Sequence, residues 1–175
     1  MSILRYLLTF TLSFAFVFAA GCSDPKPDYS EFYKPEPGDD PVDPINPGLE
    51  DNQLRVMSFN VRYSAGDDGA NSWDNRKKAV PAMFADQQPT VLGVQEARLD
   101  QKTYMDENCA GYKSVGVGRT DGKNAGEFMA IYYLDDAVKL EKWGTFWLSE
   151  TPDTPSVGWD ASTYRTATWA LFTHY

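Results

Sequence analysis

The sequence predicts a layered α/β (α+β) domain with a mixed β-sheet and outer helices. Three observations support this fold class. Short segments alternate apolar and polar residues or are apolar throughout, other segments place apolar residues at helical spacing, and the order is strand, helix, strand, helix and then several strands. The folded part begins at Leu54, and the 175 residues allow one ordinary domain or part of a larger one.

The first predicted elements are a strand, a helical region and a buried strand. Residues 54–60 alternate apolar and polar side chains, which is typical of a strand. Asn71 or Ser72 can cap a helix, and Pro81 lies inside its apolar pattern, so the helix kinks there or restarts with Pro81 in its first turn. Residues 90–96 form a continuous apolar run that ends in a charge, as in a buried strand.

The second half predicts one more helix and several strands. The helix is expected at 100–108, and the strands at 112–118, 128–133, 138–148 and 167–172. A polar, glycine-bearing loop covers 119–126, and a proline- and glycine-rich loop covers 149–162. Cys109 is expected to be a small core residue.

The N-terminus predicts export. An apolar run from Tyr6 to Ala20 follows the single charge of Arg5 and is too short for a membrane-spanning helix. Small residues directly before Cys22 resemble a bacterial lipoprotein signal, which predicts a signal peptide at 1–22 with a lipidated Cys22 and an anchor in the outer membrane, facing the periplasm or the cell surface. The alternative is an ordinary secretory signal with an incidental cysteine.

Residues 23–53 predict a disordered tether. They hold seven of the 11 prolines, nine acidic residues and two basic ones, and such sequence cannot bury a core. The acidic residues resemble surface-export signals of Bacteroidetes lipoproteins, and a plain spacer is the alternative.

Charge and composition exclude several classes of function. The formal net charge is -9, but residues 54–175 hold 13 basic and 16 acidic residues, so most of the acidity belongs to the tether. Nucleic acid remains open as a partner but is not favoured, because no basic stripe is visible. Two cysteines cannot form a disulfide-rich scaffold, and a single histidine excludes chemistry that needs two.

Two polar residues follow apolar strands and are the first candidates for a site. Glu96 ends the run 90–96, and a carboxylate there needs a partner, either a hard cation such as Mg²⁺ or a salt bridge to Arg98 or Arg62. Asn60 ends the strand 54–60, where it could start a turn or orient a phosphate or a water.

A set of motifs in register extends from Leu54 to the end of the chain. They are Ser58–Arg62, Asp74–Arg76, Val94–Glu96, Val117–Lys123, Gly126–Glu127, Ile131–Tyr133, Gly144–Pro152, Gly158–Asp160, Arg165 and Ala167–Ala170. Together they resemble the endonuclease/exonuclease/phosphatase superfamily with its deoxyribonuclease-like fold, and its secreted bacterial branch in particular. The resemblance implies a four-layer sandwich of two mixed β-sheets flanked by helices, incomplete in this chain.

The resemblance also implies roles for individual residues. Glu96 would bind Mg²⁺ or Mn²⁺ directly, and Asn60 would help to hold the metal or the attacked phosphate. Glu127 would orient a catalytic histidine, and Arg165 would contact the phosphate, which suits its planar fork. The implied reaction is hydrolysis of a phosphodiester or phosphomonoester by metal-activated water.

Other motif residues have less specific interpretations. Arg119 would bind substrate and Asp121 would lie near it, with a solvated loop as the alternative for both. The tryptophans Trp147, Trp159 and Trp169 are interpreted as core or loop-packing residues rather than platforms for stacking substrate.

The motifs expected from the second half of the family are missing from this sequence, including its histidines. His174 lies one strand too early and is interpreted as an exposed strand-end residue. We therefore expect an N-terminal fragment, monomeric and without appreciable hydrolase activity alone, with one uncovered face. The alternatives are a non-catalytic surface lipoprotein on the same scaffold and, given the tryptophans, a carbohydrate-binding β-domain. The substrate class stays open.

Overall fold

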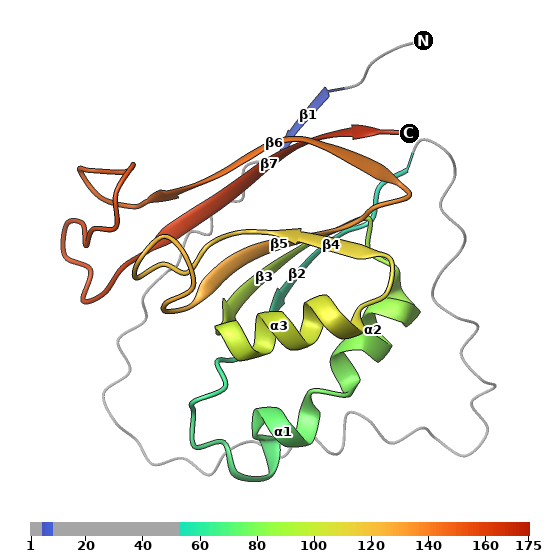
Figure 1. Cartoon of the computed structure of the whole chain (residues 1–175), viewed down its shortest axis with the longest axis horizontal. Coiled ribbons are helices and arrows are strands. Elements are labelled where there is room, and N and C mark those ends of the chain that lie inside the picture. The colour runs from blue at the N-terminus through green and yellow to red at the C-terminus, as the bar shows by residue number, and fades with distance from the viewer. Residues whose placement is uncertain (1–4, 9–52) are drawn as a thin grey trace.

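The computed structural model describes residues 5–8 and 53–175 of the chain. Two β-sheets lie face to face, and helices cover the outer face of one of them (Figure 1). The predicted lipidation site Cys22, residues 23–52 of the predicted tether and most of the expected signal peptide lie outside the described residues.

A mixed sheet of four strands forms the middle layer, in the order β2-β3-β5-β4. Its strands are β2 (Val56–Asn60), β3 (Val91–Ala97), β4 (Tyr112–Val115) and β5 (Phe128–Leu134). β2 and β3 are parallel, and the connection between them carries the helices α1 (Trp73–Arg76) and α2 (Ala79–Gln87), as a parallel crossover requires. The other pairs are antiparallel.

The second sheet has three strands in the order β1-β7-β6. They are β1 (Arg5–Leu8), β6 (Val138–Trp147) and β7 (Thr166–His174), and both pairs are antiparallel. In the described part of the chain this sheet is antiparallel, because the long connection between β6 and β7 returns the chain alongside β6.

Two apolar cores separate the layers. One lies between the four-stranded sheet and the helices and includes Phe84, Leu92, Met105 and Tyr132, all at most 1% exposed. The other lies between the sheets and is built from residues of β3–β7. Cys109 belongs to the first core and is 4% exposed, which confirms its predicted role as a small core residue.

The helices follow the sequence pattern closely. Pro81 lies in the first turn of α2, so the helical region restarts after α1 and does not kink. A short 3-10 helix, Gly69–Asn71, precedes α1, and α3 (Leu99–Asn108) follows β3 directly. No helix in the described part of the chain has the length and apolar character needed to cross a bilayer.

The predicted fold class is confirmed in the described residues. Three of the four expected layers are formed, namely one helical layer and two sheets (Figure 1). β2 lies at an edge of its sheet and is only partly covered, since Val56 is 44% exposed. An uncovered face was expected from the sequence, and β2 provides part of it.

Candidate functional site

Glu96 lies at a β-bulge near the end of β3. The pairing with β5 shifts between Val94 and Ala97, so Gln95 and Glu96 together face one residue of the partner strand. Glu96 has φ of 63°, in the left-handed region that glycine normally occupies. Strain of this kind persists only where neighbouring groups hold it, and it is concentrated at functional sites.

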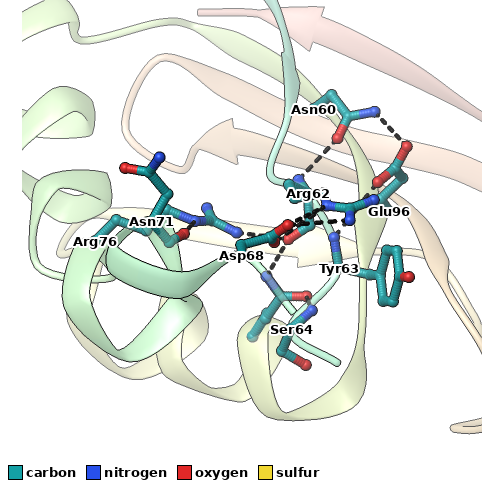
Figure 2. Close-up of polar contacts among 9 residues, drawn as sticks. Asn60, Arg62, Tyr63, Ser64, Asp68, Asn71, Arg76 and Glu96 are labelled. Carbon is teal, nitrogen blue, oxygen red and sulfur yellow. Dashed lines mark hydrogen bonds and ion pairs between the residues drawn. The ribbon is translucent and has the colours of Figure 1, made fainter. Parts of the chain in front are cut away.

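Two groups, one from the last residue of β2 and one from the loop after it, hold the Glu96 carboxylate. The Asn60 amide nitrogen donates to Oε1 at 2.8 Å, and the backbone N–H of Tyr63 donates to Oε2 at 3.4 Å. The Asn60 amide oxygen accepts from the backbone N–H of Arg62 at 2.8 Å, which fixes the amide orientation. Figure 2 shows Asn60 between Arg62 and Glu96. The two predicted strand-end residues are thus in direct contact.

The salt-bridge alternative for Glu96 is wrong. Arg62 pairs instead with Asp68, with 3.1 Å between Nη2 and Oδ1 (Figure 2), and no ion pair joins Glu96 to Arg62 or Arg98 in the described part of the chain. The hydrogen bond that Arg62 donates to Asp68 raises the pKa of Arg62. Arg62 also has a positive φ of 53°, and Arg76 donates to its carbonyl oxygen at 2.7 Å. The turn that supplies the Tyr63 N–H is therefore held from two sides.

Gln101 completes this support and was missed by the sequence analysis. Its side chain is fully buried, and its Oε1 accepts from the N–H groups of Ser64 at 2.9 Å and Arg98 at 3.1 Å. Its Nε2 donates to the carbonyl oxygen of Arg62 at 2.8 Å. Gln101 thus joins the loop after β2 to the start of α3. A polar residue in the first turn of a helix was the only available signal, and it indicates a cap as readily as a site.

The second pair of the site is Arg119 with Glu127. Their side chains are 13% and 18% exposed, and 3.0 Å separates Arg119 Nη1 from Glu127 Oε2. Burial lowers the pKa of Arg119, and the cation of Arg165 acts in the same direction, while Glu127 and Glu96 oppose it. The solvated-loop alternative is wrong for Arg119, because its side chain is largely buried and ion-paired.

Asp121 shapes the loop that carries Arg119. Its Oδ1 accepts from the N–H groups of Lys123 and Ala125 at 2.8 and 2.9 Å, and these hydrogen bonds lower its pKa. Asp121 is exposed, so the solvated-loop interpretation suits it.

The three tryptophans of the motifs differ in exposure. Trp147 is 5% exposed and donates to the carbonyl oxygen of Arg119 at 2.7 Å, and Trp169 packs against Gly144. Their interpretation as packing residues is confirmed. It is wrong for Trp159, which is 73% exposed.

Arg165 and His174 lie at opposite ends of β7. Arg165 precedes the strand and is exposed, and its carbonyl oxygen accepts from Leu148 N–H at 2.8 Å. His174 is the last of the nine residues of the strand. At about 3.3 Å per residue the two ends are on the order of 25 Å apart. His174 is half-buried and lies away from the site, so it does not act there.

The donor atoms at Glu96 fit a hard divalent cation. Mg²⁺ is usually held by one or two carboxylates together with waters and substrate phosphate oxygens. Glu96 alone supplies the one carboxylate that such a site needs from the protein. The Asn60 amide turns its nitrogen to Glu96 and its oxygen to the Arg62 N–H, so it orients the carboxylate, and its oxygen keeps one lone pair for a cation. In the described part of the chain, no three His, Cys, Asp or Glu side chains converge on a common point.

Comparison with known proteins gives consistent relatives among solved structures, although no family model and no curated protein matches the sequence. An endonuclease/exonuclease/phosphatase from Bacteroides vulgatus has 38% identity and a TM-score of 0.66, over 68% of this chain and 46% of that one. A mannosyl-6-phosphatase from Bacteroides thetaiotaomicron has 42% identity and a TM-score of 0.66, over 69% and 46%.

A second protein from Bacteroides thetaiotaomicron, of the endonuclease/exonuclease/phosphatase family, has 41% identity and a TM-score of 0.67, over 69% of this chain and 44% of that one. The chain spans slightly less than half the length of these relatives. The motifs, the fold and these relatives agree: the chain belongs to the endonuclease/exonuclease/phosphatase superfamily.

Proposed function

We propose that the native protein is a metal-dependent phosphoesterase, and that this chain supplies the metal-binding carboxylate and the phosphate-binding arginines of its site. The observation that carries the proposal is the geometry of Glu96, a strained carboxylate held by Asn60 and by the Tyr63 N–H. A carboxylate that only stabilised the fold would gain nothing from a left-handed backbone.

The proposed roles follow from the contacts of each side chain. Glu96 binds Mg²⁺ or Mn²⁺, which would offset the negative charge that develops on the phosphoryl group. Asn60 keeps the carboxylate oriented. Arg165 is exposed and binds phosphate oxygens through its planar guanidinium, and Glu127 holds Arg119 in place by an ion pair. The reaction breaks the P–O bond to the leaving alcohol as a new P–O bond to water forms.

A sugar phosphate is the first substrate to test, because a mannosyl-6-phosphatase is among the similar proteins. Phosphodiesters remain the second class. Export and anchoring through a lipidated Cys22 belong to the same proposal and rest on the sequence of the first 22 residues.

The test compares Glu96→Gln with Glu107→Gln, a matched change at an exposed glutamate on α3. Glu96→Gln should weaken Mn²⁺ binding, measured by titration calorimetry, by at least about 100-fold, since even changes next to a ligand weaken metal binding 10- to 100-fold. It should also abolish Mn²⁺-dependent hydrolysis of mannose 6-phosphate and bis-p-nitrophenyl phosphate by the native protein. Equal Mn²⁺ affinity in the two variants would refute the proposal.

A further inference from the structure

We propose that Trp159 and the acidic loop around it form the subsite for a neutral sugar ring of the substrate. The loop is residues 148–165, between β6 and β7, and is called the β6–β7 loop below. This inference rests on the proposed function, since it assigns the part of the substrate that lies beyond the phosphate.

Trp159 is displayed to solvent by a strained turn. Its side chain is 73% exposed, and its φ of 51° lies in a region that bulky residues rarely adopt. The turn is closed by a hydrogen bond from Ala161 N–H to the Gly158 carbonyl oxygen at 3.1 Å. Exposing a large aromatic ring and straining its backbone are both unfavourable, so the ring is expected to have a contact partner that this chain does not supply.

The base of the turn is rigid. Gly158 packs so closely on the start of the loop that an added Cβ would lie 2.3 Å from Ser149 Cα and 2.4 Å from the Leu148 carbonyl oxygen. The hydroxyls of Ser149 and Ser156 are hydrogen-bonded to each other, and Ser149 Oγ accepts from Thr151 N–H at 3.1 Å. A preorganised loop loses little conformational entropy when a ligand binds.

The same contacts connect Trp159 to the phosphate-binding side of the site. Leu148, against which Gly158 packs, donates its N–H to the backbone carbonyl oxygen of Arg165 at 2.8 Å. Trp147, the last residue of β6, donates to the carbonyl oxygen of Arg119 at 2.7 Å. In Figure 1 the β6–β7 loop and the loop before β5 lie at the same end of the two sheets. A phosphate on Arg165 would leave the rest of its molecule beside the β6–β7 loop.

Charge decides which kind of molecule the loop accepts. No Lys or Arg occurs between Lys142 and Arg165, whereas Glu150, Asp153 and Asp160 are all exposed. A polyanion such as a nucleic acid would be repelled there, because its binding needs a cation for each neutralised phosphate. A sugar ring is neutral, its hydroxyls donate hydrogen bonds to carboxylates, and its C–H face packs on an indole.

The experiment measures equilibrium binding by the native protein in EDTA, where no hydrolysis occurs. The probes are mannose 6-phosphate and methyl phosphate, which share the phosphate and differ by the ring. We expect mannose 6-phosphate to bind about tenfold more tightly, as one aromatic contact of moderate strength provides. Trp159→Ala should reduce this ratio to within about twofold and leave methyl phosphate binding unchanged. Trp159→Phe should keep most of the preference for mannose 6-phosphate, because it keeps an aromatic ring.

The matched control is Trp143→Ala, which removes another exposed tryptophan, 41% exposed on β6. It should leave the ratio unchanged. If Trp159→Ala keeps the tenfold preference for mannose 6-phosphate over methyl phosphate, the proposal is wrong. It is also wrong if oligothymidylate binds through Trp159 more tightly than mannose 6-phosphate does. The phosphoesterase proposal is tested independently, because its test measures Mn²⁺ binding and hydrolysis, whereas this experiment measures binding in EDTA.

Discussion

Glu96 shows how a single residue can combine poor local geometry with a specific role. For an L-amino acid the left-handed conformation costs about 1–2 kcal/mol, and here it is opposed by the hydrogen bonds from Asn60 and Tyr63. The conformation brings the carboxylate to the loop after β2. A glycine would adopt the same backbone at lower energy but could not bind a cation.

This strain predicts an inverted order of stability for two substitutions. Both Glu96→Gly and Glu96→Ala remove the carboxylate, but only the alanine keeps the unfavourable φ of 63°. We expect the glycine variant to have the higher free energy of unfolding, by about 1 kcal/mol, in urea titrations.

The control is the same pair of substitutions at Glu107, inside α3. At Glu107 the alanine variant should have the higher free energy of unfolding, by about 1 kcal/mol, as is usual inside a helix. A Glu96→Ala variant as stable as Glu96→Gly would mean that the site relaxes and that the strain is not retained.

The predictability of the site differs from residue to residue. Glu96 and Asn60 could be singled out because each ends a predicted strand, where sites are often built, and the parallel β2–β3 pairing then brings the two ends together. Gln101 could not, because its three partners are backbone groups, and backbone groups leave no pattern in the sequence. The Arg62–Asp68 pair depends on a loop conformation that only the assembled fold defines.

At the scale of elements, periodicity located nearly every helix and strand. The largest boundary error is β4, which was expected over 112–118 but ends at Val115. Gly116 has φ of 136°, which interrupts the regular ladder after Val115, and pairing with β5 resumes only as a single bridge from Gly118 to Phe128. Partner choice was not predictable either, since the β2–β3 pairing joins segments about 35 residues apart.

The loop before β5 depends on close packing at Gly118. An added Cβ there would lie 2.4 Å from the Ala125 carbonyl oxygen, and the loop also relies on the 2.8 Å bond from Gly118 N–H to Lys123. We expect Gly118→Ala to lower the free energy of unfolding by about 1–3 kcal/mol and to weaken phosphate binding through a displaced Arg119. Urea titration and phosphate titration measure the two effects.

Gly93→Ala in β3 is the matched control. A Cβ at Gly93 has its closest neighbour at 3.6 Å, and the backbone there is ordinary. This variant should keep its stability within about 0.5–1 kcal/mol of the native value, because glycine is itself unfavourable in a strand. Similar losses in both variants would show that the close approach at Gly118 has no special role.

For the whole molecule, buried acids of the helix–sheet core predict a loss of stability at high pH. Burial, aided by Asp106, raises the pKa of Cys109 from 9.0 to about 12, and burial raises the pKa of Tyr112 from 10.0 to about 12. Above the ordinary values the unfolded chain releases protons that the folded chain keeps. The stabilisation is therefore complete below pH 9 and is lost between pH 9 and about 12.

Urea titrations from pH 7 to 10 should show a constant free energy of unfolding up to about pH 8 and then a decline, approaching about 1.4 kcal/mol per pH unit for each titrating group. Cys109→Ala should lower the baseline and flatten the slope between pH 9 and 10, where the tyrosine does not yet contribute. A slope that is identical with and without the thiol would show that Cys109 does not titrate differently in the folded chain.

The position of β2 has a consequence for the order of folding events. Among the strands that the structure describes, β2 pairs with β3 alone, and their parallel pairing closes a long loop that carries α1 and α2. Loops of that kind close late, after local hairpins such as β6–β7. Until they close, Asn60 and the Tyr63 N–H cannot reach Glu96. Cation affinity should therefore arise only in the last stage of folding, which would make a bound Mn²⁺ ion a kinetic reporter for the docking of β2.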